Sequence, residues 1–310
     1  MLADCGRPQP ERGSADEPPC AGVFGMKKLL DGQTGAFLRN LLGMLTGLTV
    51  AALLTQAAPA VGQPRLETSA PRAILVDLTT NSTLFERNAD ELTAPASLVK
   101  LMTVEVIFDR IRRGRLSLED EFTVSKEAGR FARGATMPLR PGAKVKLRDL
   151  LQGLLVASAN NAAVVAAEGI AGSVPRFVAL MNERAKTVGL PRSRFTNPHG
   201  LPDAGQRVTM REMALLAAHL IREYPEHYAL FGQKEFASGG TTWRNRNPIL
   251  DGELGGDGLK TGQTREAGFA LVASAERSGR RLVLAMNGLG SEAERAREAR
   301  KLLEWGFRRR

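Results

Sequence analysis

Strand-forming runs stand at both ends of the main body of this 310-residue chain, and helix-forming segments lie between them. Each end carries two apolar runs separated by a short polar turn, at residues 73–77 and 83–87 and at residues 268–275 and 281–286. Such pairs predict antiparallel strands. We therefore expect an α+β fold, in which the two ends of one domain build an antiparallel sheet around a helical insertion.

Six helices are expected from segments in which apolar residues recur every three or four positions. They are residues 97–108, 147–155, 162–170, 175–187, 209–224 and 291–305. Thr209 is the expected N-cap of its helix, and Glu212 three residues later predicts a capping box. The segment 236–258 is rich in Gly and Asn and has little period, so no element is assigned to it.

The N-terminal region has the layout of an export signal. Residues 1–25 are rich in Pro, Gly and acidic residues, and we expect them to be disordered or to precede the true start. In residues 26–60, basic residues are followed by an apolar run at 41–54 and then by Ala58-Pro59-Ala60, as in a secretory signal peptide. The run is short for a membrane-spanning helix, although an uncleaved N-terminal anchor is the alternative.

The positions of the cysteines and the net charge limit which cellular compartment and which kinds of partner are expected. Cys5 and Cys20 both precede the apolar run, so the body from residue 65 to residue 307 has no disulfide, which fits an exported protein in the periplasm or cell envelope. The net charge of +10 favours an anionic neighbour such as a membrane or a cell-wall polymer, or serves only solubility. The sequence has no zinc-ligand spacing and no RNA-binding signature, so neither a metal, a cofactor nor nucleic acid is expected.

Three short motifs follow one another along the chain. They are Ser97-x-x-Lys100, Ser158-x-Asn160 and Lys260-Thr261-Gly262. Ser97 and Lys100 share one face of a helix, where a lysine with a lowered pKa can act as the base for a serine nucleophile. Each motif alone is weak, but the three in this order indicate a serine acyl-transfer site.

With these motifs, the sequence resembles the low-molecular-weight penicillin-binding proteins of the serine D-Ala-D-Ala carboxypeptidase family. The resemblance covers roughly residues 70–307 and includes Asn197-Pro198-His199-Gly200-Leu201 and Asp257-Gly258-Leu259 before the third motif. It implies a β-lactamase/transpeptidase-like fold. It also implies an enzyme that removes the terminal D-Ala from peptidoglycan stem pentapeptides and is acylated by β-lactam antibiotics.

The chemistry assigns a role to each motif. Ser97 is the expected nucleophile, Lys100 its base and Ser158 a proton relay to the leaving amine. Lys260 is the expected cation that lowers the pKa of Lys100, and Asn160 is expected to bind substrate amides.

The remaining site residues are expected to bind the substrate. The family resemblance implies that Thr261 and Arg295 hold its free carboxylate, beside Gly262. The backbone N–H groups of Ser97 and Gln263 are the candidates for an oxyanion hole.

Each assignment has a structural alternative. Ser97, Ser158 and Asn160 would then only cap helices, Lys100 would be a solvated helix lysine, and the Lys260 motif would be an ordinary turn. Arg295 lies in a helix crowded with charged residues, which favours a surface role almost as strongly. His199 lies in a Pro-Gly turn, so we expect a structural role for it.

Two departures from the family pattern bear on function. Many relatives have Tyr or His where this chain has Gln263, which casts doubt on a side-chain role there. The few residues after Trp305 leave no room for the β-rich second domain of many relatives, so we expect a single catalytic domain over 65–307 without a C-terminal anchor.

Three other functions compete with the carboxypeptidase. A D,D-endopeptidase that cleaves peptidoglycan crosslinks is the first, because some shorter relatives do so. A β-lactamase is disfavoured, since the region from Pro191 to His199 lacks the acidic residue expected about 35 positions after the second motif. A non-catalytic penicillin-binding sensor is the third, although all three motifs are intact.

Overall fold

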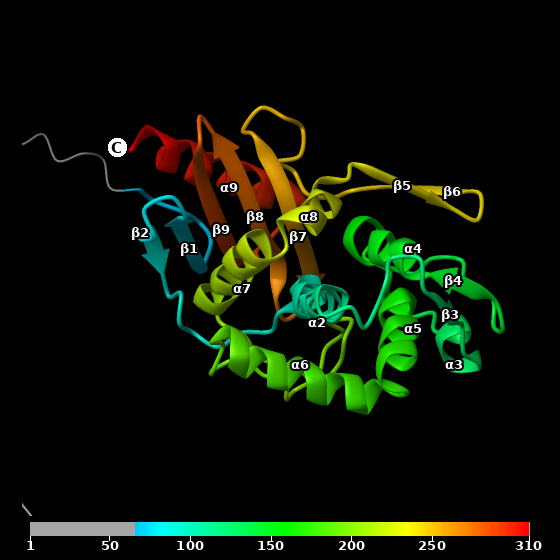
Figure 1. Ribbon diagram of the computed structural model, residues 1–310. Coiled ribbons are helices and arrows are strands. Elements are labelled where there is room, and N and C mark those ends of the chain that lie inside the picture. The colour runs from blue at the N-terminus through cyan, green and yellow to red at the C-terminus, as the bar shows by residue number, and fades with distance from the viewer. Residues whose placement is uncertain (1–65, 310) are drawn as a thin grey trace, which may run out of the picture. The chain divides into compact units, whose positions relative to one another are not determined.

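The sheet joins the two ends of the described part of the chain, as expected. The computed structural model describes residues 66–309, and its main sheet has the order β2-β1-β9-β8-β7 (Figure 1). All four neighbouring pairs are antiparallel. The strands are β1 (Arg72–Asp77), β2 (Ser82–Arg87), β7 (Gly256–Thr264), β8 (Gly268–Arg277) and β9 (Arg280–Leu289). The α+β prediction is confirmed, whereas the predictions for residues 1–60 lie outside the described residues.

A tight turn sets the register of the two longest strands. Arg277 pairs with Arg280, which leaves only Ser278 and Gly279 in the loop. Both loop residues have positive φ, at 50° and 76°. This is the two-residue hairpin whose twist matches that of its strands, and glycine at its second position adopts the conformation without strain.

Helices cover both faces of the sheet. Alternate side chains of the strands point to opposite faces, so that Leu75 packs with α9 and Ile74 with the helical insertion. Figure 1 shows α9 on one face and α2 and α7 on the other. The helices are α2 (Lys100–Arg112), α3 (Lys126–Arg130), α4 (Leu147–Gln152), α5 (Asn160–Ala171), α6 (Val174–Val188), α7 (Met210–Glu223), α8 (Pro225–Tyr228) and α9 (Glu292–Arg308), with short turns η1 (Ala96–Val99), η2 (Gly153–Ala157) and η3 (Ala229–Gly232).

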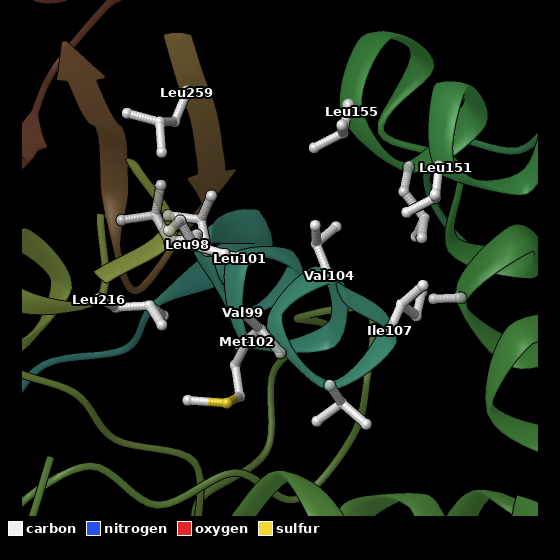
Figure 2. Packing of buried hydrophobic residues seen from close by; sticks show 14 of the residues in the cluster. Leu98, Val99, Leu101, Met102, Val104, Ile107, Leu151, Leu155, Leu216 and Leu259 are labelled. Atoms are coloured by element: carbon white, nitrogen blue, oxygen red, sulfur yellow. The ribbon is translucent and has the colours of Figure 1, made fainter. Parts of the chain in front are cut away.

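The helix α2 is the centre of the larger core. All residues from Lys100 to Asp109 are buried, which is typical of a helix packed on every side. In Figure 2, Leu101 points toward Leu259 of β7, while Ile107 points toward Leu151 of α4. The first turn of this helix therefore lies in a water-poor interior, and this burial decides the chemistry of Lys100.

The six expected helices are confirmed to within four residues at each end, and three features differ from expectation. The segment 236–258 contains most of a hairpin, β5 (Glu235–Ser238) and β6 (Thr241–Arg244), which the sequence analysis missed. A second small sheet pairs β3 (Glu121–Thr123), where the sequence of residues 121–124 favours a short strand, with β4 (Lys144–Lys146), which the sequence analysis missed.

The third difference is the capping box, of which only half forms. The hydroxyl of Thr209 accepts from the N–H of Glu212, at 3.1 Å. The carboxylate of Glu212 instead accepts from the N–H of Arg192 and the hydroxyl of Ser193.

Within residues 66–309, no single helix has the length and apolar composition to cross a membrane. One bent pair, α5 with α6, passes that test by length and composition only, with an angle of 86° between the two helices.

Candidate active site

Ser97 is held between β7 and the turn at residues 197–201. It lies in η1, directly after Ala96, whose φ of 49° is unusual for a residue with a side chain. A side chain at Gly200 would begin 2.0 Å from the carbonyl oxygen of Ala96, and one at Gly262 would begin 3.2 Å from its Cβ. Glycine at both positions therefore lets two backbone segments close on Ser97.

Lys100 is buried with its ammonium group aimed at Ser97. Its Nζ donates to the Ser97 hydroxyl at 3.2 Å, to the Asn160 Oδ1 at 2.7 Å and to the His199 carbonyl at 2.5 Å. None of the three acceptors carries a negative charge. Burial, and secondly the positive charge of Arg246, lower the pKa of Lys100 to about 7. A large fraction of this lysine is thus neutral at pH 7 and able to accept a proton.

Ser158 and Asn160 flank a break between two helices. The π-helical turn η2 ends at Ala157, the next residue, Ser158, has a φ of 58°, and α5 begins at Asn160. Such π-turns are frequent at functional sites because they redirect a side chain. Here the break brings Ser158 to the wall that also contains Ser97.

Both the oxygen and the nitrogen of the Asn160 side-chain amide form hydrogen bonds within the protein. Its Oδ1 accepts from Lys100, while its Nδ2 donates to the carbonyl of Arg133 at 2.8 Å. Its backbone N–H also donates to the carbonyl of Ala135. Asn160 therefore positions Lys100 and ties down the 131–138 segment, and its expected contact with substrate amides stays a prediction.

The third motif lies on a strand, β7, and not in a turn. Lys260 is 2% exposed, and its Nζ donates to the Thr261 carbonyl at 3.0 Å. Burial, followed by the charges of Lys100, Arg246 and Arg295, holds the pKa of Lys260 well below its usual range. The charge of Lys100 thus acts on Lys260, whereas Lys260, the cation expected to lower the pKa of Lys100, is not among the groups that do so. The cation that acts on Lys100 most directly is Arg246, which the sequence analysis missed.

Arg295 is buried rather than on the surface. It is 4% exposed, and its Nη2 donates to the carbonyl of Arg246 at 3.2 Å. Its only ion pair among the described residues is a long one, 3.8 Å, to the exposed Glu292. Within residues 66–309, its buried Nε has no hydrogen-bond partner. A surface role for Arg295 is wrong, and its buried cation is available to an anion in the site.

A cavity of about 120 Å³ collects these groups. Ser97, Ser158, Asn160, Thr261, Gly262, Gln263 and Arg295 line it, together with Gly134, Ala135, His199 and Arg246. Lys100 and Lys260 lie behind its wall. Its lining residues carry two cations, Arg246 and Arg295, and one carboxylate, Glu292, so the net charge of the lining is positive. Among residues 66–309, no group of three or more His, Cys, Asp or Glu side chains is placed to hold a metal ion.

His199 contributes to the site without acting as a base. Its carbonyl binds Lys100, and its Nδ1 accepts from the N–H of Leu201 at 3.2 Å, so the ring proton resides on Nε2. Burial, then the charges of Lys100 and Arg133, lower the pKa of His199 to about 4. The imidazole is therefore neutral at pH 7.

The arrangement of Ser97 and Lys100 defines a class of protein, the serine acyl-transfer enzymes that use a lysine base. The chain belongs to the peptidase S11 family, described as D-alanyl-D-alanine carboxypeptidase, whose profile matches residues 57–289.

Individual relatives agree with this assignment. The chain is 42% identical over 241 residues to the D-alanyl-D-alanine carboxypeptidase DacC of Escherichia coli, a match that covers 76% of this chain and 60% of that protein. It is 30% identical to a D-alanyl-D-alanine endopeptidase of Pseudomonas aeruginosa, over 76% of this chain and 77% of that one. The fold matches penicillin binding protein 5 of Haemophilus influenzae, with a TM-score of 0.77, 38% identity and coverage of 80% and 73%.

The chain spans about three fifths of the length of the first curated relatives it matches, since the matches cover 60% to 62% of them. The predicted β-lactamase/transpeptidase-like fold and the family resemblance are both confirmed.

Proposed function

We propose that the chain is a serine D-Ala-D-Ala carboxypeptidase, which removes the terminal D-Ala from peptidoglycan stem pentapeptides through an acyl-enzyme. The observation that carries this proposal is the 3.2 Å contact between Lys100 Nζ and Ser97 Oγ, with the pKa of that lysine lowered to about 7. A second feature supports the choice of substrate. Thr261 and Arg295 line the same cavity, where they offer a hydroxyl and a buried cation to a free carboxylate.

The reaction follows from these positions. Neutral Lys100 takes the proton of Ser97 as its Oγ attacks the penultimate D-Ala carbonyl. The backbone N–H groups of Ser97 and Gln263 stabilise the oxyanion. Ser158 relays a proton to the leaving nitrogen, and free D-Ala departs. A water molecule, deprotonated by the same lysine, then hydrolyses the ester. A β-lactam acylates Ser97 by the same first step.

The endopeptidase remains the second candidate, because one relative with that name also covers most of this chain. The two activities differ in the leaving group, which is D-Ala alone or the amino group of a crosslinked peptide. Arg295 favours the carboxypeptidase, since a buried cation whose Nε has no hydrogen-bond partner within residues 66–309 suits a compact leaving residue that ends in a carboxylate.

Two assays test the proposal. Fluorescent penicillin should label the protein and fail to label Ser97→Ala; labelling of that variant would refute the nucleophile. Incubation with pentapeptide muropeptides should release D-Ala, whereas preferential cleavage of crosslinked dimers would favour the endopeptidase. Labelling by penicillin without either product would indicate a sensor.

Arg295 can be tested with a matched control on the same helix. Arg295→Ala should weaken the hydrolysis of substrates with a free C-terminal carboxylate more than it slows acylation by penicillin. Arg297→Ala removes an equal charge from a side chain that is 64% exposed, so it should change neither. Equal losses on both ligands in Arg295→Ala would argue against the carboxylate role.

We also propose that the protein is exported and acts in the periplasm or cell envelope, on the strength of the signal-like layout of residues 26–60. The net charge of +10 supports a weak contact with an anionic membrane or cell-wall polymer. Alkaline phosphatase fused after residue 60 would be active only if residues 26–60 direct export.

A further inference from the structure

The cavity has two sides, and only one has been assigned a ligand. Thr261, Arg295 and Arg246 form one side, where Arg295 is bonded to the backbone of Arg246. Gly134 and His199 belong to the other side, where a side chain at Gly134 would contact Asn160 and Leu201. Ser97 lies between β7 and the 197–201 turn, hence between these two sides.

The direction of a bound peptide follows from this arrangement. If its C-terminal carboxylate binds Thr261 and Arg295 and its scissile carbonyl lies at Ser97, the preceding residues run toward Gly134 and His199. An extended peptide advances about 3.5 Å per residue, so the residue before D-Ala-D-Ala reaches the rim on that side. Residues at the rim can therefore contact the side chain of that substrate residue and select among substrates by its chemistry.

Arg133 stands at this rim. Its carbonyl is held by Asn160 at 2.8 Å, and the next two residues, Gly134 and Ala135, line the cavity. Its side chain is exposed, and its positive charge is one of those that lower the pKa of His199, a residue that lines the cavity.

The charge of Arg133 is not neutralised within the described part of the chain. Among the basic residues of the insertion, Lys146 and Arg148 pair with Glu119, and Lys144 pairs with Glu121, whereas Arg130 and Arg140 resemble Arg133 in having no ion pair within residues 66–309. No ion pair within residues 66–309 includes Arg133. An exposed arginine that is anchored through its backbone and lacks a carboxylate partner suits a ligand carboxylate, which it can bind in a bidentate manner.

We propose that Arg133 is a specificity residue, whose guanidinium binds a carboxylate on the residue that precedes D-Ala-D-Ala in the substrate. This inference rests on the proposed function and adds the substrate class: peptides with an acidic side chain at that position. Because Asn160 binds the backbone carbonyl of Arg133, replacing the side chain leaves that anchor in place.

The test compares two isosteric peptides, acetyl-L-glutamyl-D-Ala-D-Ala and acetyl-L-glutaminyl-D-Ala-D-Ala, which differ only in one negative charge. The intact protein should prefer the glutamyl peptide by about fivefold in kcat/KM, as expected for one exposed ion pair, mainly through KM. Arg133→Gln should reduce the preference to about one. The preference of the intact protein should also decrease with added salt.

Arg140→Gln is the matched control. Arg140 is exposed on the same loop and loses the same charge, but its backbone carbonyl is not bonded to Asn160 and its charge is not among those that lower the pKa of His199. It should keep the full preference, which separates a direct contact from general electrostatic attraction. Three results would each overturn the inference. The preference for the glutamyl peptide could be equal in Arg133→Gln and the intact protein, it could be lost equally in Arg140→Gln, or the intact protein could show no preference.

A second readout separates this inference from the proposed function. Carbenicillin differs from benzylpenicillin by one carboxylate on the acyl side chain, and the ratio of their acylation rates should follow the same pattern in the three proteins. Hydrolysis or acylation without discrimination overturns only the role of Arg133. Absence of both reactions in the intact protein overturns the proposed function and this inference together.

Discussion

Two charged side chains lie five residues apart on α2, both buried, and their surroundings are opposite. Lys100 donates only to neutral oxygens, and the charge that shifts its pKa is the positive one of Arg246. Glu105 is 0% exposed but accepts from Arg184 at 3.1 Å, His219 at 3.2 Å and Tyr224 at 3.1 Å. One charge is isolated, whereas the other is fully paired.

The pKa values of the two groups record this difference. Burial lowers the pKa of Lys100, and no partner opposes it. Burial alone would raise the pKa of Glu105, but the hydrogen bonds from His219 and Arg184, with their charges, outweigh burial and lower it. On the same helix, the charged form of Lys100 is thus destabilised, whereas the charged form of Glu105 is stabilised by its partners.

The comparison separates reactivity from stability. A buried charge without a counter-ion destabilises the fold and becomes a base near neutral pH, which an active site requires. A buried charge with several donors links elements together: Glu105 of α2 joins Arg184 of α6 and His219 of α7. We expect loss of function without loss of fold at Lys100, and the reverse at Glu105.

The largest expected effect is that of Lys100→Met. Removing the general base should lower the acylation rate at least about 10³-fold. The substitution conserves volume and removes an unfavourable buried cation, so Tm should stay within about 3 °C of that of the intact protein. Stopped-flow acylation by fluorescent penicillin and calorimetry measure the two quantities. A rate within tenfold of the original would show that Lys100 is not the base.

The second effect is on stability, in Glu105→Ala. Leaving the guanidinium of Arg184 without its main partner should cost about 3 kcal/mol, or about 6–12 °C in Tm for a domain of this size. Glu223→Ala is the control, because Glu223 forms an exposed ion pair with Arg112 and should cost less than about 1 kcal/mol. Equal losses in the two variants would contradict the paired-charge account.

The loss in Glu105→Ala should also depend on pH. Because the folded pKa of Glu105 is lowered from 4.5, its contribution is complete above about 4.5 and is lost as the pH falls through the folded value. The gap in stability between the two proteins should therefore narrow in acid, which urea denaturation at a series of pH values would reveal.

The third prediction is the pH profile of acylation. With the pKa of Lys100 at about 7, the rate should rise about tenfold per pH unit below 7 and level off above about 8. Because Lys100 and Lys260 are coupled, the profile reports the pair and not one residue. Glu105→Gln should leave the midpoint of this profile unchanged. A midpoint near 10 would mean that burial does not tune this lysine.

The sequence indicates the candidate nucleophile and base because the spacing of residues within each of the three motifs is local. It also indicates the sheet, because each pair of strands is marked by two apolar runs with a short polar turn between them. The missed hairpin β5–β6 also had a local signal, since Gly239-Gly240 separates two runs that carry Phe236 and Trp243. Glu105 had no local signal, because this carboxylate acquires its partners from helices over 70 residues away.

Arg246 was missed for a related reason. It lies outside any helix or strand, in a segment without a hydrophobic period, and it is exposed. Only the fold brings it to the cavity, where its carbonyl meets Arg295 and its charge reaches Lys100. Electrostatic roles of this kind depend on distance in space, which spacing in the sequence does not determine.

The smallest expected effect therefore tests Arg246 itself. Arg246→Gln removes a positive charge that lowers the pKa of Lys100, so the midpoint of the acylation profile should move up by about half a unit. That shift is about threefold in rate below pH 7 and none on the plateau. Arg244→Gln, two residues away and 86% exposed, carries the same charge change and should leave the midpoint in place.

A loss that is equal at every pH would instead identify Arg246 as a substrate-binding residue without influence on the base. Added salt distinguishes the two cases further, because it screens the charge of an exposed arginine. The difference in midpoint between Arg246→Gln and the intact protein should shrink at high salt, while the buried environment that sets most of the shift in Lys100 stays as it is.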